Sequence, residues 1–162
     1  MNKENIYSFL KQNNIKFEVD EHIPVYNMED LRKVSLKYSN YDGKNIFLRD
    51  DKKRNYYLIT ILGDKKVDLK KFKIDNGLRP LSFASEVELY NFLKLTPGSV
   101  TPLGLLNDKE KVVKFYIDKD FFKEPFIIGV HPNNNSATVW LNVNDLVDII
   151  KNHGNDVYIT KI

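Results

Sequence analysis

Residues 43–62 read GKNIFLRDDKKRNYYLITIL, which is two apolar runs separated by a short charged turn. The pattern predicts a β-hairpin with strands at about Asn45–Arg49 and Tyr56–Leu62 and with a basic tip. The second run is apolar almost throughout, so we expect it in the interior of a sheet. Lys44 stands at the mouth of the first strand, where a cation can meet a phosphate, a carboxylate or an ester. A lysine before an apolar run is also commonly just the solvated start of a strand.

Upstream of the hairpin, the sequence predicts a helix, a strand and a second helix. Apolar residues recur at helical spacing in residues 2–13, and the segment IKFEVDEH, residues 15–22, alternates as a half-buried strand does. Asn27 is a candidate N-cap for a helix from about Met28 to Leu36. His22 falls at the end of the strand, where we expect no chemical role.

Downstream, helices and strands are unevenly mixed. The sequence predicts a lysine-dense helix or turn within residues 67–74, a brief strand at Leu81–Ala84, and a helix from the capping box Ser85 and Glu88 to about Leu93. Further strands are expected at Lys111–Ile117, Phe126–Val130, Ala137–Leu141 and Val157–Ile159, with a helical turn at Asp118–Phe122 and a last helix that Asn142 or Asn144 caps and Gly154 ends. This order favours an α+β or mixed-sheet domain.

The length and composition suit one domain. The chain has 162 residues, of which 42% are hydrophobic, enough for a single core. It contains no cysteine, which excludes disulfides, thiol nucleophiles and cysteine-ligated metals. The N-terminal MNKENIYSFLKQNN lacks the pattern of a secretory signal, and no apolar run is long enough for a membrane span. We therefore expect a soluble, cytoplasmic protein with no membrane association.

Basic residues gather in the middle of the chain. Between Lys44 and Arg79 there are eleven Lys and Arg against five Asp, a balance of +6, whereas the whole chain carries +3, so the rest carries −3. A basic segment in an acidic frame is typical of a protein that contacts a polyanion on one face. A lysine-rich composition that spreads its charge over solvated faces gives a similar count, so charge alone does not decide between the two.

Two loops of unusual composition could join Lys44 in a site. Residues 96–104, TPGSVTPLG, hold two prolines and two glycines in nine residues and predict a rigid loop, and residues 131–136, HPNNNS, form a polar one. A cation with exposed backbone amides suits an oxyanion or a phosphate. The sequence has no nucleophile elbow, P-loop or dinucleotide fingerprint, and its three histidines lack metal-ligand spacing. If the three segments meet, we expect a hydrolytic or binding site without metal or cofactor.

Four segments, in this order and spacing, resemble a known family. They are Lys44-Asn45-Ile46-Phe47-Leu48-Arg49-Asp50, Leu81-Ser82-Phe83-Ala84-Ser85, Gly98-Ser99-Val100-Thr101-Pro102, and His131-Pro132-Asn133-Asn134-Asn135 followed by Ala137-Thr138-Val139. The chain resembles, nearly from end to end, the prolyl-tRNA editing family of free-standing aminoacyl-tRNA deacylases, which are related to the YbaK-type editing domain inserted in bacterial prolyl-tRNA synthetases. It is most similar to the members that clear Ala-tRNA(Pro). The resemblance implies one editing domain over residues 1–162, α+β with a mixed, largely antiparallel sheet curved toward a barrel and surrounded by helices.

The resemblance also implies an activity, the hydrolysis of the ester between a wrong amino acid and tRNA, with no metal or other cofactor. Lys44 would hold the terminal adenosine phosphate or the aminoacyl end, and the amides around Gly98 would position the scissile carbonyl. Substrate and backbone would orient the attacking water. The residues implied to bind substrate, by lining or bracing the pocket, are Asn45, Phe47, Ser99, Thr101, Pro102, His131, Asn135 and Thr138. For His131, a purely structural place in its loop is an alternative.

The partner that the resemblance implies is the acceptor end of tRNA(Pro) carrying a wrong amino acid, with prolyl-tRNA synthetase as a further candidate. The basic middle of the chain then has an expected role, because phosphate contacts position a nucleic acid on a protein. We expect the acceptor stem to contact Lys52, Lys53, Arg54 and Arg79.

The chain departs from the family pattern at three positions. Ile46 stands where leucine is usual, which we expect to matter little, whereas Gly43 precedes the lysine and Asn27 begins the second helix where threonine is more usual. The last two bear on amino-acid selectivity. Two alternatives therefore stay open: a deacylase that clears another small amino acid, Cys or Ser, and a non-catalytic tRNA-binding or regulatory protein of the same fold.

Overall fold

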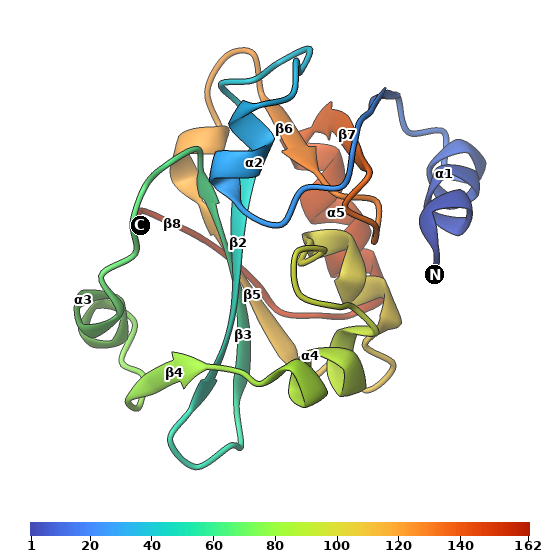
Figure 1. Ribbon diagram of the computed structural model, residues 1–162. Helices are drawn as coiled ribbons and strands as arrows, with labels where there is room; N and C mark the ends of the chain where they lie inside the picture. The colour runs from blue at the N-terminus through green and yellow to red at the C-terminus, as the bar shows by residue number, and fades with distance from the viewer.

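The strands form two sheets (Figure 1). The computed structural model, which describes residues 1–162, pairs one sheet in the order β1 (Phe17–Glu21), β7 (Ala137–Asn142) and β6 (Ile127–Val130). The other sheet has the order β4 (Leu81–Phe83), β2 (Gly43–Asp50), β3 (Tyr56–Leu62), β5 (Val113–Asp118) and β8 (Val157–Thr160). An isolated bridge between Asp42 and Gly129 connects the two sheets.

The expected mixed, largely antiparallel α+β architecture is confirmed. Only β3 with β5 and β5 with β8 run parallel, and every other neighbouring pair is antiparallel. The division into two sheets differs from the single sheet that we expected. Its cause is the pairing of β1 with β7, in which Phe17 lies opposite Leu141, and no local pattern encodes a partner so far along the chain. The curvature toward a barrel stays a prediction.

The hairpin forms as predicted and holds the centre of its sheet. In the β2–β3 register, Phe47 lies opposite Leu58 and Ile46 lies opposite Ile59. Because side chains alternate along a strand, the first pair faces the main core, and the second faces a smaller cluster that includes Phe72. β3 is therefore covered on both faces, which explains its unbroken apolar sequence.

Five helices surround the sheets, and local capping explains where most of them begin. They are α1 (Lys3–Gln12), α2 (Met28–Arg32), α3 (Leu69–Asp75), α4 (Glu86–Leu93) and α5 (Val143–His153), with short 3-10 turns at Pro102–Asn107 and Lys119–Phe121. Asn27 caps α2, the Ser85 and Glu88 capping box opens α4, and Asn142 rather than Asn144 caps α5. The lysine-dense segment is a helix, not a turn, because Asp68 caps it. None of these helices is both long and apolar enough to cross a membrane.

The prediction that the second helix reaches Leu36 is wrong, because α2 ends at Arg32. Beyond it, the amide of Lys37 donates a hydrogen bond of 2.7 Å to the Asp20 carboxylate, and the Lys37 ammonium pairs with Glu18 at 2.6 Å. Both carboxylates belong to β1, so contacts with a distant strand hold this segment in a non-helical conformation.

Candidate functional site

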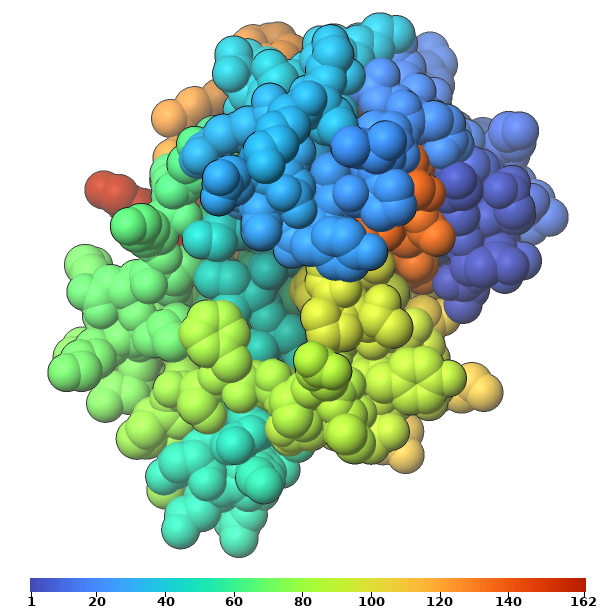
Figure 2. Space-filling model, viewed as in Figure 1, coloured from blue at the N-terminus to red at the C-terminus, as the bar shows by residue number.

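Lys44 lies in a cavity of about 270 Å³ at the open edge of β2. β4 pairs with β2 only at Leu48–Asp50, so no strand covers the edge around Lys44. In Figure 2, β2 is visible in teal between the blue surface of α2 and the yellow surface of the loop near residue 100. The lining residues are Val25, Tyr26, Asn27, Met28, Leu31, Gly43, Lys44, Asn45, Gly98, Val100 and His131. The lysine, the Gly/Pro loop and the His/Asn loop therefore meet.

The ammonium group of Lys44 has no counter-ion within the protein. It takes part in none of the ion pairs of the structure, and no lining residue of the cavity carries a carboxylate. A half-buried cation without an anion partner favours an anionic or strongly polarised ligand, because the interaction is stronger away from bulk water. The charge of this cavity is thus positive and localised on one side chain.

Gly98 places the backbone of its loop directly against the segment before α2. Its φ is +87°, and a Cβ at this position would lie 2.9 Å from Cδ1 of Tyr26 and 3.3 Å from its Cα. Only glycine combines this backbone conformation with so close an approach. The loop therefore presents backbone rather than side chain to the cavity here.

The Gly98 loop is anchored to the His131 loop by a partly buried hydrogen bond. Thr101 is fully buried, and its Oγ1 donates to the backbone oxygen of His131 at 2.6 Å. Thr101 also caps the 3-10 turn that begins at Pro102, where its hydroxyl accepts from the Leu103 amide at 3.4 Å. Thr101 and Pro102 thus hold the loop without lining the cavity.

His131 offers the cavity a neutral imidazole. Its Nδ1 lies 2.9 Å from the backbone oxygen of Ala137, which can only accept, so Nδ1 carries the proton and Nε2 keeps a lone pair. Burial, together with the nearby His22, lowers the pKa of His131, and the bond to Ala137 opposes this effect. The uncharged ring is therefore the main form at neutral pH.

Asn135 braces the wall that leads into α2. Its Nδ2 donates to the backbone oxygen of Val25 at 2.9 Å, and its own backbone oxygen accepts from the Val25 amide at 3.1 Å. Val25 and Tyr26 line the cavity, whereas Asn135 does not. Asn135 therefore acts on the site through this segment.

His22, for which the sequence suggested no chemical role, lies beside the site. Its Nε2 is 2.9 Å from Oγ1 of Thr138, and its ring centre is 6.3 Å from that of His131. Thr138 is buried and, like His22, lies outside the cavity lining. The pairing of β1 with β7 produces this proximity, and no signal in the sequence could have indicated it.

Asn45 and Phe47 point in toward the protein, and only Asn45 reaches the cavity. Oδ1 of Asn45 accepts a hydrogen bond of 2.5 Å from Oγ1 of Thr60. Phe47 is buried in the main core, where its ring centre lies 5.8 Å from that of Tyr56. Phe47 shares its face of β2 with Asn45, but it lies two residues further along the strand, where the main core covers that face, so it does not line the cavity as we expected. Ser99 is buried in its loop and also lies outside the lining.

The basic residues at the hairpin tip lie far from Lys44. The turn between β2 and β3 carries Lys52, Lys53 and Arg54, none of which forms an ion pair within the protein. From Lys44 to the end of β2 is about 20 Å at the usual rise of a strand. Arg79 donates two hydrogen bonds to the Asp51 carboxylate, at 2.7 and 3.0 Å. These side chains are thus placed to contact a large ligand, not the contents of the cavity.

Sequence reasoning missed most of the wall formed by residues 25–31. Val25, Tyr26, Met28 and Leu31 all line the cavity, together with Asn27 and Gly43, two of the three positions that depart from the family pattern. The only sequence feature that bears on this wall is the run His22-Ile23-Pro24-Val25. It predicts that the chain continues in an extended conformation after the strand, but it does not indicate which part of the protein this segment contacts.

The cavity can bind and polarise a carbonyl or a phosphate group, but it contains no side-chain nucleophile of its own. Its polar groups include one ammonium, the backbone near Gly98, the side-chain amides of Asn27 and Asn45, the Tyr26 hydroxyl and the neutral His131 ring. Backbone donors and a cation stabilise negative charge that develops on a carbonyl oxygen. Such a site suits attack by a water molecule on a bound ester.

Comparison with known proteins finds relatives over most of the chain. The family model of the aminoacyl-tRNA editing domain matches residues 22–149. The chain is 42% identical over 153 residues to the prolyl-tRNA editing protein ProX of Acetoanaerobium sticklandii, a match that covers 94% of this chain and 93% of that protein. It is 34% identical over 145 residues to the prolyl-tRNA synthetase associated domain-containing protein 1 of Bos taurus, with 88% and 84% of the two chains covered.

A solved structure has the same fold. It is provisionally described as a trans-editing enzyme for prolyl-tRNA synthetase, and it superposes with a TM-score of 0.70 over 99% of this chain and 96% of its own. The sequence identity is 20%, so this likeness concerns the fold alone.

Proposed function

Because this chain belongs to the aminoacyl-tRNA editing domain family, we propose that it is a trans-editing deacylase that hydrolyses the ester of mischarged Ala-tRNA(Pro). The observation that carries the proposal is the cavity in which an unpaired lysine cation, the Gly98 backbone and the neutral His131 ring converge. Substrate discrimination explains why such an enzyme is needed. A synthetase pocket built for proline rejects the smaller alanine poorly, since each missing methylene is worth only about 1–3 kcal/mol.

In the proposed reaction, a water molecule attacks the carbonyl carbon of the aminoacyl ester. The bond from this carbon to the ribose oxygen breaks, the ribose oxygen receives a proton, and the products are a free amino acid and tRNA. Amides around Gly98 stabilise the oxyanion, and Lys44 holds the terminal adenosine phosphate or the aminoacyl end. Nε2 of His131, as an acceptor, helps to orient the water or the substrate ammonium.

The walls of the cavity are proposed to set which amino acid is cleared. Tyr26, Met28 and Val100 limit its size, and Asn27 and Gly43 lie at its border. A deacylase for Cys or Ser on tRNA is the alternative within the class, because these amino acids are also small. A non-catalytic tRNA-binding protein is the alternative outside it, although binding alone does not require the Gly98 loop to be held against Tyr26.

We further propose that the acceptor stem of tRNA(Pro) lies along the hairpin, with its phosphates at Lys52, Lys53 and Arg54. Separation of these side chains from the cavity by about 20 Å suits a ligand that enters the cavity only with its end. Arg79 belongs to this surface, but its guanidinium already donates two hydrogen bonds to the Asp51 carboxylate, so it is less available to a phosphate. Contact with prolyl-tRNA synthetase and a cytoplasmic location are further parts of the proposal.

The proposal takes residues 1–162 as one editing domain, beyond the 22–149 that match the family model. Support comes from both ends of the chain. Ile6 and Leu10 of α1 are fully buried in the main core, and β8 pairs in parallel with β5.

A deacylation assay tests the function. tRNA(Pro) charged with Ala, Cys, Ser or Pro is incubated with the wild-type protein and with Lys44→Ala. We expect selective release of alanine, and a rate about 100-fold lower for Lys44→Ala, because the end of the tRNA is no longer held in position for attack. If none of the four charged tRNAs is hydrolysed faster than the spontaneous rate, the proposal that the protein is a deacylase is wrong. Faster hydrolysis of the Cys or Ser ester than of the Ala ester would support the alternative substrate. If Lys44→Ala is as active as the wild type, Lys44 does not have the role proposed for it.

A further inference from the structure

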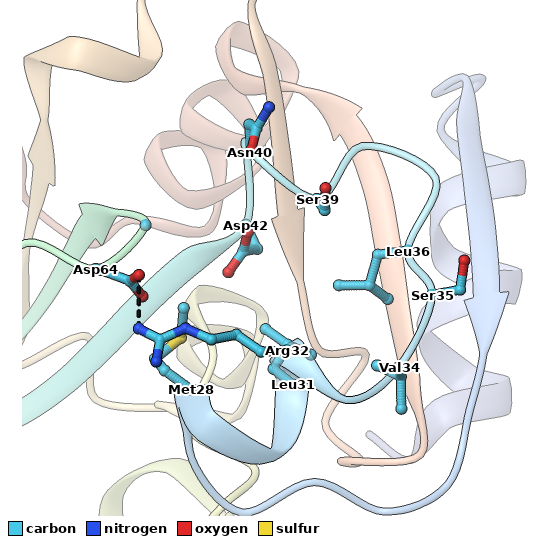
Figure 3. Close-up of a pocket in the computed structure, with 11 residues that line it drawn as sticks. Met28, Leu31, Arg32, Val34, Ser35, Leu36, Ser39, Asn40, Asp42 and Asp64 are labelled. Atoms are coloured by element: carbon cyan, nitrogen blue, oxygen red, sulfur yellow. Dashed lines mark ion pairs between the residues drawn. The ribbon is translucent and has the colours of Figure 1, made fainter.

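A second cavity also borders α2 and takes no part in the proposed reaction (Figure 3). Its volume is about 530 Å³, and α2, the segment after it and the turn at Gly63-Asp64 enclose it. Met28 and Leu31 line this cavity as well as the one at Lys44. α2 is therefore a wall common to both.

Asp42 places a buried carboxylate in this second cavity, and no other side chain forms a hydrogen bond or an ion pair with it. The residue is 6% exposed, and the only hydrogen bond to its carboxylate comes from its own backbone amide. Burial raises the pKa of Asp42 to about 6, so the group is still mainly ionised at neutral pH. The charge of Arg32 opposes this rise and that of Asp64 adds to it, but neither forms an ion pair with Asp42. A buried charge without a paired counter-ion lowers stability, and a bound cation would remove that cost.

Arg32 provides a positive group at the rim of the same cavity. Its guanidinium contacts Asp64 at 2.6 Å, in a pair whose side chains are 61% and 60% exposed. The side chains of an exposed ion pair can change position at little cost in free energy. A guanidinium has five N–H donors, and a single contact with Asp64 leaves most of them available. Arg32 can therefore bind a carboxylate that enters the cavity.

The polar and apolar sides of the cavity are separated. Figure 3 shows Asp42 on the side where Arg32 and Asp64 meet, and the side chains of Leu36 and Val34 on the other side. An ammonium group, a carboxylate and an aliphatic chain in one small molecule match this arrangement. A metal ion matches it less well, since nowhere in the structure do three carboxylate or imidazole side chains gather as metal ligands.

We propose that this second cavity binds a free α-amino acid with an aliphatic side chain. Its ammonium group pairs with Asp42, its carboxylate with Arg32, and its side chain packs on Leu31 and Leu36. Binding at this site does not depend on the function proposed above. Any effect on deacylation does, and it would act through α2, because Met28 and Leu31 face both cavities.

Calorimetric titration of the full chain with L-leucine, without tRNA, tests the inference. We expect saturable binding, and affinity reduced about tenfold or more in Asp42→Asn and in Arg32→Gln, because each loses a charged hydrogen bond. 4-Methylpentanoate, which lacks the ammonium group, and L-leucinamide, which lacks the carboxylate, are expected to bind as weakly as L-leucine binds to these variants. Asp75→Asn, which removes an exposed carboxylate paired with Lys71, is the matched control and should bind L-leucine as the wild type does.

Several results would overturn the inference: no binding of L-leucine, equal binding of leucinamide, or full affinity in Asp42→Asn. The near-isosteric Asp42→Asn keeps the fold, which its thermal unfolding verifies, so lost binding is not lost structure. Binding should persist in Lys44→Ala, and its loss there would place the amino acid in the Lys44 cavity instead. An inactive deacylase that still binds L-leucine would refute the proposed function and leave this inference standing.

Discussion

Thr101 Oγ1 donates a hydrogen bond of 2.6 Å to the backbone oxygen of His131, and this bond ties together the two loops that border the Lys44 cavity. The two residues are thirty positions apart in the chain. A shift of either loop away from the other would break this bond, so the cavity geometry depends on a side chain that does not line it.

Replacement of Thr101 by valine keeps the shape of the side chain and removes the donor. We expect a loss of about 1 kcal/mol in unfolding free energy, because a partly buried carbonyl loses its partner, and a deacylation rate lower by about tenfold, because the loops separate. Chemical denaturation and the Ala-tRNA(Pro) assay measure the two effects. Thr101→Ser restores the hydroxyl and should restore the rate; equal rates for valine and serine variants would contradict the coupling.

Gly98→Ala introduces a Cβ 2.9 Å from Tyr26, in a backbone conformation that also disfavours alanine. We expect the loop to move away from Tyr26 and the deacylation rate to fall by about tenfold or more. Gly77→Ala is a matched control, because Gly77 has a φ of +63° but no atom near the position of a Cβ. Both variants carry the backbone strain of about 1–2 kcal/mol, whereas only Gly98→Ala should lose activity.

The hairpin tip is predicted to contribute phosphate contacts. Replacing Lys52, Lys53 and Arg54 with glutamine should weaken tRNA binding and make it less sensitive to salt, with the slope of log K against log salt reduced by about 2–3. Filter binding over a range of salt concentrations measures this slope. A control that changes the exposed Lys16, Lys119 and Lys151 to glutamine should leave it nearly unchanged, and an equal effect of both triple variants would argue against a specific surface.

Asp42 makes stability depend on pH in a defined direction. Its pKa is raised from 3.8 to about 6 in the folded protein, so the folded state binds this proton more tightly than the unfolded state. Stability therefore falls as pH rises between about 4 and 6, and the full penalty is present above this window. Asp42→Asn should be more stable than the wild type by up to about 2 kcal/mol at pH 7.5 and no more stable at pH 4.

Urea denaturation at several pH values measures this difference. A constant difference between the two proteins at all pH values would show that the Asp42 carboxylate does not titrate as proposed. A gain in stability from Asp42→Asn, together with lost binding of L-leucine, would indicate that the carboxylate is kept for a ligand at the expense of the fold.

Most secondary-structure elements could be predicted because their signals act within one turn or along one strand. Asn27, the Ser85 capping box and Gly154 mark helix ends through hydrogen bonds between neighbours. The candidate site could be predicted from the sequence only in part. Lys44, Gly98 and His131 were brought together by resemblance to a family, since no local pattern indicates that their segments meet in one cavity.

The sequence by itself determined the β2–β3 hairpin, its interior strand and the basic tip, because apolar alternation and turn composition are physical properties of a few adjacent residues. Only the tertiary structure decided that the strands divide into two sheets, that Phe47 faces the core, and that His22 lies beside the site. These features depend on packing between distant segments, as the contact of His22 with Thr138, 116 residues away, illustrates. The free energy of such contacts exceeds local preference and cannot be read from a stretch of sequence.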